Sequence, residues 1–218
     1  MQHRAYTALV VVVVRPQRAT DAQRFASLQK IRRAHDAAYE RWLPHLTLIP
    51  PFQLHGPPCN AALPAWLATD LDAVADTAQT VCDGTKRHTI KLQEIHSFPL
   101  RKYENIHLRP DRASAAPLAA FQKTLQQALH HCIRDKSKQR MRFVPHASLG
   151  QAYTPRDAET IVEKAVRTLQ VKPPRRMPQP EAPVQGIWAD VATIQVMYKP
   201  VGAQGSYTVW RTLPLQPT

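Results

Sequence analysis

One short pattern, Pro-His-x-Ser/Thr-Leu, occurs twice in this chain and constrains its fold more than any other feature. The two copies are Pro44-His45-Leu46-Thr47-Leu48 and Pro145-His146-Ala147-Ser148-Leu149. Successive side chains of a β-strand point to opposite faces, so a strand places His45 and Thr47 on one face and the leucines on the other. The same alternation places His146 beside Ser148. Each copy is therefore expected to present one imidazole and one hydroxyl, with the leucines in the core.

The segments around the two copies follow the same order of strand, helix, short strand with Pro-His, helix and strand. The first series is predicted at 8–14, 20–40, 44–49, 63–81 and 89–95, and the second at 105–108, 114–132, 142–149, 155–169 and 187–198, with a further strand at 206–213. Pro50-Pro51 is expected to end the strand at 44–49. A repeated series predicts two lobes, over about 1–100 and 104–213, related by a pseudo-twofold axis. The alternative is a chance alternation of elements.

Charge and length indicate the class of partner. The 218 residues suit a single domain, 1–218, and 29 Lys and Arg against 16 Asp and Glu give a net charge of +13. This imbalance favours polyanions, which are nucleic acid, nucleotides or an anionic membrane surface. The chain lacks the glycine-rich patterns of phosphate-binding loops. Residues 172–183 hold five prolines and two arginines, a composition typical of an exposed loop or linker.

The apolar runs and the cysteines indicate in which compartment of the cell the protein is expected. The longest apolar run, Ala8–Val14, is too short for a bilayer, which takes about 20 residues to cross, so no membrane span is expected. No cleavage site for a signal peptide follows it. Three cysteines without a Cys-x-x-Cys pair indicate reduced thiols, and hence an intracellular protein of the cytoplasm or nucleus.

Two imidazoles and two hydroxyls that face one site suit an anionic phosphodiester. Histidine titrates near pH 6.5, so one ring can be neutral and the other protonated at the same pH. The neutral ring can take a proton from the attacking oxygen, and the protonated ring can give one to the leaving oxygen. The hydroxyls can donate hydrogen bonds to the other phosphate oxygens. This chemistry requires no metal and no cofactor. The alternative is that both histidines are ordinary strand residues.

Two segments resemble the motifs of the 2H phosphoesterase superfamily, which includes RNA 2′,5′-ligase-like proteins and cyclic nucleotide phosphodiesterases. These segments are Trp42–Phe52, with its trailing Pro-Phe, and Pro145–Gln151. The resemblance implies an α+β, bilobal fold in which mostly antiparallel sheets are flanked by helices and a cleft lies between the lobes. It implies metal-free chemistry on 2′,3′-cyclic phosphates or related RNA linkages. Ser148 stands where threonine is commoner in the family, and serine keeps the hydroxyl.

Three further residues are candidates for substrate binding. Phe52 can stack on a base, although a place in the core is the alternative. Arg101 can contact phosphate or lie in a solvated turn, and Tyr153 can line the cleft or only pack. The other histidines are expected at surface or hydrogen-bonded positions, without a metal site.

The residues and the resemblance together predict a monomeric, metal-independent phosphodiesterase. Its expected substrate is a 2′,3′-cyclic phosphate on an RNA end or a nucleoside, opened to a 2′-phosphate. One alternative is an RNA-binding module that keeps the fold without turnover. Another is an enzyme of the same type that acts on 2′,5′-oligoadenylate or trims RNA 3′ ends. The sequence leaves open which histidine is the acid and which is the base.

Overall fold

A computed structural model describes residues 5–54, 63–133, 142–174 and 183–217. Its strands are β1 (Tyr6–Val13), β2 (His45–Leu54), β3 (His88–Pro99), β4 (Glu104–Pro110), β5 (Ala147–Ala152), β6 (Ile187–Val191), β7 (Thr193–Pro200) and β8 (Thr208–Pro214). Its α-helices are α1 (Ala19–His35), α2 (Ala65–Asp83), α3 (Arg112–Ala128) and α5 (Pro155–Leu169). Short 3₁₀ turns follow at Tyr39–Arg41 and Leu129–His131. No helix of the described residues is long and apolar enough to cross a membrane.

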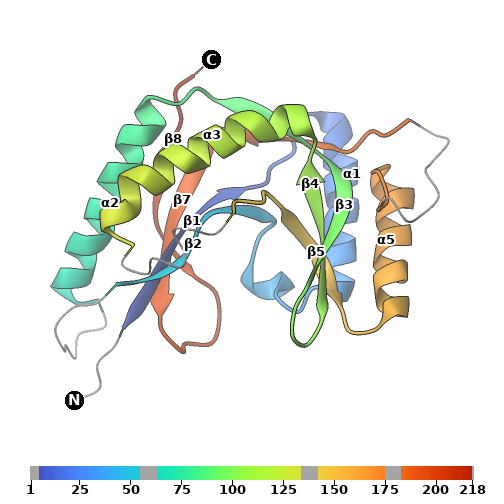
Figure 1. Cartoon of the computed structure of the whole chain (residues 1–218), viewed down its shortest axis with the longest axis horizontal. Coiled ribbons are helices and arrows are strands. Elements are labelled where there is room, and N and C mark those ends of the chain that lie inside the picture. Colours follow the sequence, from blue (N-terminus) through green and yellow to red (C-terminus); the bar gives the residue numbers. More distant parts are fainter. Residues whose placement is uncertain (1–4, 55–62, 134–141, 175–182, 218) are drawn as a thin grey trace.

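The strands form two four-stranded antiparallel sheets with helices packed against them. Sheet A has the order β2-β1-β7-β8, and sheet B has the order β5-β4-β3-β6. Helices α1 and α5 pack on sheet B, and α2 packs on sheet A, whereas α3 contacts β2 of sheet A and β3 of sheet B. Figure 1 shows α3 lying across the top of both sheets. The expected α+β fold with antiparallel sheets flanked by helices is confirmed.

The two sheets do not follow the expected division into lobes at 1–100 and 104–213. Strand β3 pairs with β4 and β6, while β7 and β8 join β1 in sheet A. The run at 187–198, predicted as one strand, divides at Ala192 into β6 and β7, one in each sheet. The side chains that join the main core lie at odd positions from Ile187 to Val191 and then at Ile194 and Val196. The chain therefore exchanges strands between the two halves.

Strand β2 continues through Pro50-Pro51, where the sequence predicts its end. The strand lies at the edge of sheet A, so a proline that donates no hydrogen bond is tolerated there. Its register with β1 runs from Ala8 opposite Phe52 to Val10 opposite Ile49. The prolines occupy the irregular segment between these pairs, where β2 has one extra residue.

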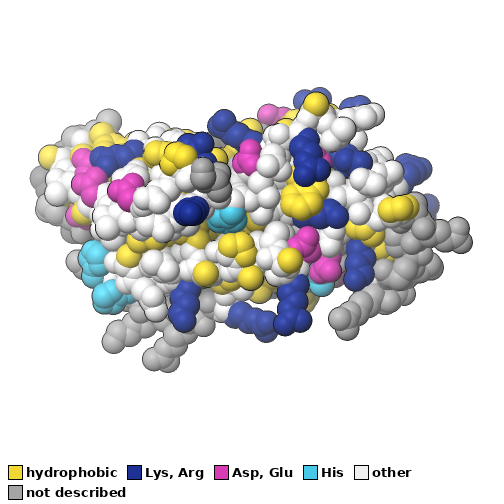
Figure 2. Space-filling model, turned by 90° about the horizontal axis from the view of Figure 1, so that it is seen from above, with side chains coloured by type: hydrophobic (Ala, Val, Ile, Leu, Met, Phe, Trp, Pro, Cys, Tyr) yellow, Lys and Arg dark blue, Asp and Glu magenta, His cyan; other side chains and the backbone are white. Residues whose placement is uncertain are grey.

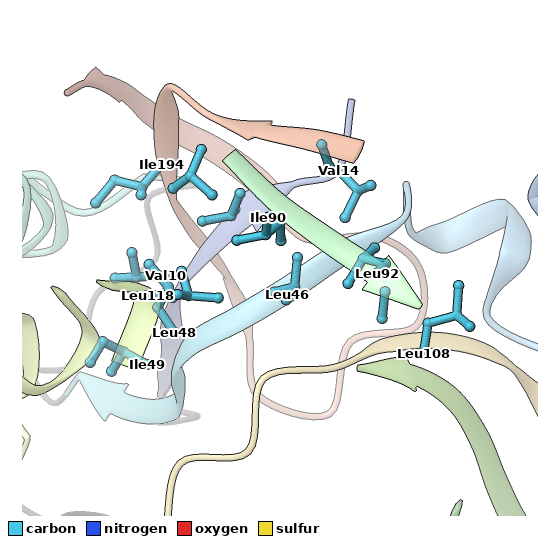
Figure 3. Packing of buried hydrophobic residues seen from close by; sticks show 14 of the residues in the cluster. Val10, Val14, Leu46, Leu48, Ile49, Ile90, Leu92, Leu108, Leu118 and Ile194 are labelled. Carbon is cyan, nitrogen blue, oxygen red and sulfur yellow. The ribbon is translucent and has the colours of Figure 1, made fainter. Parts of the chain in front are cut away.

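The buried core takes side chains from both sheets. Leu46 and Leu48 of β2 belong to one cluster with Ile90 and Leu92 of β3, as Figure 3 shows. The motif leucines, Leu149 included, are at most 1% exposed, so their predicted place in the core is confirmed. Burial of each large apolar side chain stabilises the fold by about 1.5–3 kcal/mol. The core thus fixes the strands that carry the two motifs.

The segment at 172–183 begins as ordered backbone. Lys172 donates its backbone N–H to the Gln93 carbonyl and accepts from the Ile95 N–H, which attaches it to β3. Pro173 is buried, so the start of the segment departs from the expected exposed loop. Residues 175–182 lie outside the described part of the chain.

Candidate active site

The two motifs meet where β2 of sheet A approaches β5 of sheet B. His45 and Thr47 lie on β2 and Ser148 lies on β5, while His146 comes immediately before β5. The predicted strand at 142–149 therefore begins only at Ala147. All four motif side chains are half-buried, and the residues between them are buried, as the predicted alternation requires.

Two neighbouring cavities pair the motifs crosswise. A cavity of about 490 Å³, named here the apolar chamber, is lined by Thr47 of the first motif and His146 of the second. A cavity of about 170 Å³, named here the polar pocket, is lined by His45 and Ser148. Each histidine therefore lines a cavity together with the hydroxyl of the other motif, the arrangement that a pseudo-twofold axis produces.

The two histidine rings are held in the same way. His45 Nδ1 lies 2.8 Å from the Leu43 carbonyl oxygen, and His146 Nδ1 lies 2.8 Å from the Val144 carbonyl oxygen. A carbonyl oxygen only accepts, so Nδ1 carries the hydrogen in both rings. The Nε2 of each neutral ring is therefore the atom available to exchange a proton.

The surroundings of His45 are aromatic and charged. The ring stacks on Trp42, with centroids 4.4 Å apart, and Tyr207 lies 5.0 Å from Trp42. A buried ion pair lies next to them, with 2.8 Å between Arg32 Nη2 and Asp36 Oδ2, and Arg32 also donates to the Trp42 carbonyl. Burial lowers the pKa of His45, the positive charge of Arg32 lowers it further, and the Asp36 carboxylate acts in the opposite direction.

Residues after the second motif close the polar pocket. Gln151 Oε1 accepts from the Ala37 N–H at 2.9 Å, and Gln151 Nε2 donates to Asp36 at 3.3 Å. The preceding Gly150 permits this contact, since a Cβ at that position would lie 2.7 Å from His35 Cβ. Gln151 of β5 thereby holds the residues at the end of α1 against β5 by hydrogen bonds.

Among the described residues, no carboxylate stands beside His146 as Asp36 does near His45. The His146 ring meets the rings of His107 and Phe98 edge-on, each at 5.0 Å between centroids. His107 is fully buried; its Nδ1 donates to the Asn105 carbonyl, and its Nε2 accepts from Arg109 Nε. Burial above all lowers the pKa of His107 to about 3, so this ring is neutral. Burial also lowers the pKa of His146, and the positive charge of Arg109 adds to the effect.

The two motif hydroxyls differ in their partners. Asn105 Nδ2 donates to Ser148 Oγ at 3.2 Å, which leaves the Ser148 proton free to point elsewhere. Among the described residues, none is hydrogen-bonded to the Thr47 hydroxyl. Both hydroxyls can thus donate to a bound anion.

The other three predicted residues lie away from the motifs. Phe52 is 1% exposed and belongs to the core, so the prediction that it stacks on a base is wrong. Arg101 is exposed in the turn between β3 and β4 and lines neither cavity. Tyr153 is 64% exposed and lies near Tyr103, with ring centroids 5.8 Å apart, also outside both cavities.

Several residues of the site were not predicted. They are Arg32, Asp36, Trp42, Phe98, Asn105, His107, Arg109, Gln122, Phe143 and Gln151. Alternation along β4 is the local signal that could have predicted some of them. It places Asn105, His107 and Arg109 on one face of the sheet, the face that carries Ser148 on β5. In the described part of the chain, no three His, Cys, Asp or Glu side chains gather as a metal site requires.

Comparisons with known proteins agree with this geometry. A family model for the 2′-5′ RNA ligase superfamily matches residues 16–188. Escherichia coli LigT crystallised with 3′-AMP is similar at a TM-score of 0.50 and 16% identity, over 98% of each chain. Kluyveromyces marxianus Usb1 is similar at 0.55 and 10%, over 96% of this chain and 98% of its own. A structure described as a phosphoesterase is similar at 0.51 and 12%, over 99% of both chains. No curated protein matches the chain.

Proposed function

Since this chain belongs to the 2′-5′ RNA ligase superfamily, a group of 2H phosphoesterases, we propose that it hydrolyses 2′,3′-cyclic phosphates of nucleosides or RNA ends without a metal. The superfamily that the two motifs resemble is the one whose family model matches residues 16–188. The observation that carries the proposal is the crosswise pairing, in which His45 lies with Ser148 and His146 with Thr47.

In the proposed reaction, water attacks phosphorus while a neutral histidine Nε2 takes its proton. A P–O bond to water forms, and the bond to one ribose oxygen breaks. The second, protonated histidine gives its Nε2 proton to that ribose oxygen. The Thr47 and Ser148 hydroxyls donate hydrogen bonds to the non-bridging oxygens, where charge accumulates in the transition state. The first ring then releases its proton to solvent and the second ring takes one up from solvent, which restores both.

The different surroundings of the two rings support His45 as the acid and His146 as the base. Burial and Arg32 lower the pKa of His45, but the Asp36 carboxylate opposes them, and a cation on the face of Trp42 gains further stabilisation. His146 instead faces the neutral His107 and the positive Arg109, which favour its neutral form. Of the two rings, His45 therefore has the surroundings that better accommodate the proton of the acid, although burial lowers the pKa of both.

Charge and relatives support a nucleotide substrate. The net charge is +13, and Figure 2 shows Lys and Arg side chains distributed over much of the upper face. Such a field attracts anions and raises their rate of association. The similar LigT was crystallised with 3′-AMP. Expulsion of the 3′ oxygen, which leaves a 2′-phosphate, is the proposed direction.

A substrate panel tests the proposal. The full chain is incubated, with and without EDTA, with four nucleoside 2′,3′-cyclic phosphates, an RNA ending in a cyclic phosphate, 2′,5′-oligoadenylate and an RNA with a free 3′ hydroxyl. We expect turnover of the cyclic phosphates that EDTA leaves unchanged. RNA binding without turnover would favour a binding module, and turnover of only the last two substrates would favour another linkage. Loss of activity with EDTA that a divalent ion restores would contradict the metal-free mechanism.

A further inference from the structure

The apolar chamber beside Thr47 and His146 has the size of a ligand site but no role in proton transfer. Its volume is about 490 Å³, within the range of about 300–1,000 Å³ typical of small-molecule sites. Its walls are largely carbon, from Ile49, Pro50, Phe98, Leu100, Phe143 and Val144. Such walls suit a flat group with apolar faces.

Polar side chains of Gln122, Gln126 and Arg142 interrupt these apolar walls. Gln122 of α3 lines the chamber and is only 6% exposed. Its Nε2 donates to Gln126 Oε1 at 3.0 Å, and no described residue donates a hydrogen bond to its Oε1. A ligand with a donor on its edge would satisfy this oxygen.

The corresponding space on the other side of the motifs is occupied by protein. The polar pocket measures only about 170 Å³, because the Arg32–Asp36 ion pair and Gln151 fill that side. Of the two cavities that the motif side chains line, the one on the side of His146 therefore has more room for a substrate held by its phosphate.

We propose that the apolar chamber binds the nucleobase of the nucleotide whose cyclic phosphate is opened, with Gln122 hydrogen-bonded to the base edge. This inference rests on the proposed function. A base has two apolar faces and a polar edge. Ribose joins the base to the phosphate, so a phosphate held at the motifs leaves the base to bind in a cavity beside them. Because only one side accepts the base, the ribose has one orientation and a single product isomer follows.

The test compares a substrate that has a base with one that lacks it. The substrates are uridine 2′,3′-cyclic phosphate and glycerol 1,2-cyclic phosphate. The variants are Gln122→Met, which keeps the length and removes the amide, and Leu100→Trp, which fills the chamber from a half-exposed position. Gln127→Met, on the same helix but exposed and outside the chamber, is the matched control.

We expect Gln122→Met to lower kcat/KM for the uridine substrate about 10- to 30-fold, in line with the loss of a buried hydrogen bond. Leu100→Trp is expected to lower it at least as much. The glycerol substrate should change less than about threefold in both variants, and Gln127→Met should leave both substrates unchanged. Equal losses on the two substrates, or none on either, would overturn the inference while the proposed function stands. If the wild type opens neither substrate, both proposals fail.

Discussion

The two ends of the site occupy matching positions in the sequence but have different chemistry. Positions match when they lie equally far from His45 and His146. Thirteen residues before each histidine, Arg32 matches Ile133, and three residues before it, Trp42 matches Phe143. Five residues after it, Pro50 matches Gln151. Arg32, Trp42 and Gln151 line the polar pocket, and Ile133, Phe143 and Pro50 line the apolar chamber. One end is thus filled by charged and amide groups, and the other is left open and apolar.

A feature that both ends share is one that the proposed chemistry needs, and a feature that differs between the ends is one that can vary. Both ends keep the same hydrogen bond from histidine Nδ1 to a carbonyl two residues earlier, at 2.8 Å. The flanking residues then set the protonation bias of each ring and the space beside it. We therefore expect variants at the two histidines to behave alike, and variants at the flanks to behave differently.

The largest expected effect is common to both ends. His45→Ala and His146→Ala should each lower kcat by about 10²–10⁴, the usual loss when an acid–base group is removed. Circular dichroism and the Tm should stay close to wild type, since both rings are half-buried at the site. Near-normal turnover by either folded variant would contradict a paired mechanism.

A large difference in stability is expected between the matched positions Arg32 and Ile133. Arg32→Met leaves Asp36 buried without its partner and should lower the free energy of unfolding by about 3–5 kcal/mol. Ile133→Val removes one methylene from the core and should cost about 0.5–1.5 kcal/mol. Urea unfolding monitored by tryptophan fluorescence measures both. Equal losses would show that the ion pair does not hold the polar end.

A smaller catalytic effect should follow from the support of Ser148. Asn105→Ala removes the hydrogen bond to Ser148 Oγ and should lower kcat about tenfold, the equivalent of one hydrogen bond. Ser148→Ala should cost about 10²–10³, as for a lost donor to the developing charge. The double variant should be no slower than Ser148→Ala alone. Additive losses would mean that Asn105 acts independently of Ser148.

The smallest expected effect is a shift in pH dependence at the apolar end. Arg109 lowers the pKa of His146 through its positive charge, so Arg109→Met should raise that pKa. If His146 is the base, the acidic limb of the kcat/KM profile moves to higher pH. Arg101→Met, in the exposed turn, is the control and should leave the limb in place. A shift toward lower pH would contradict the assigned charge effect.

Local patterns in the sequence predict the elements of the site well. The Thr154 and Asp157 capping box starts α5 where the sequence places it, and alternation in both motifs predicts the buried leucines. Sheet membership was missed, because pairing of β3 with β6 and of β1 with β7 joins residues far apart in the chain. The shift in alternation at Ala192 was the available signal for the change of sheet.

The surroundings of the motifs were harder to predict because they depend on tertiary contacts. Arg32 becomes part of the site only because the chain after α1 brings the Trp42 carbonyl within hydrogen-bond distance of its guanidinium. His107 is an internal, hydrogen-bonded residue as expected for a histidine outside the motifs, but its contact with His146 depends on how β4 pairs with β5. Phe52 entered the core because β2 continued past its prolines.

The most direct test of the paired mechanism is the pH profile of kcat/KM for uridine 2′,3′-cyclic phosphate in the wild type, His45→Ala and His146→Ala. The wild type should give a bell with its optimum below about pH 6.5, the ordinary pKa of histidine, since burial lowers the pKa of both rings. His45→Ala should lose the alkaline limb, which reports loss of the acid's proton, and His146→Ala should lose the acidic limb, which reports protonation of the base. Variants that each keep both limbs would contradict the assignment of these two histidines as the acid and the base.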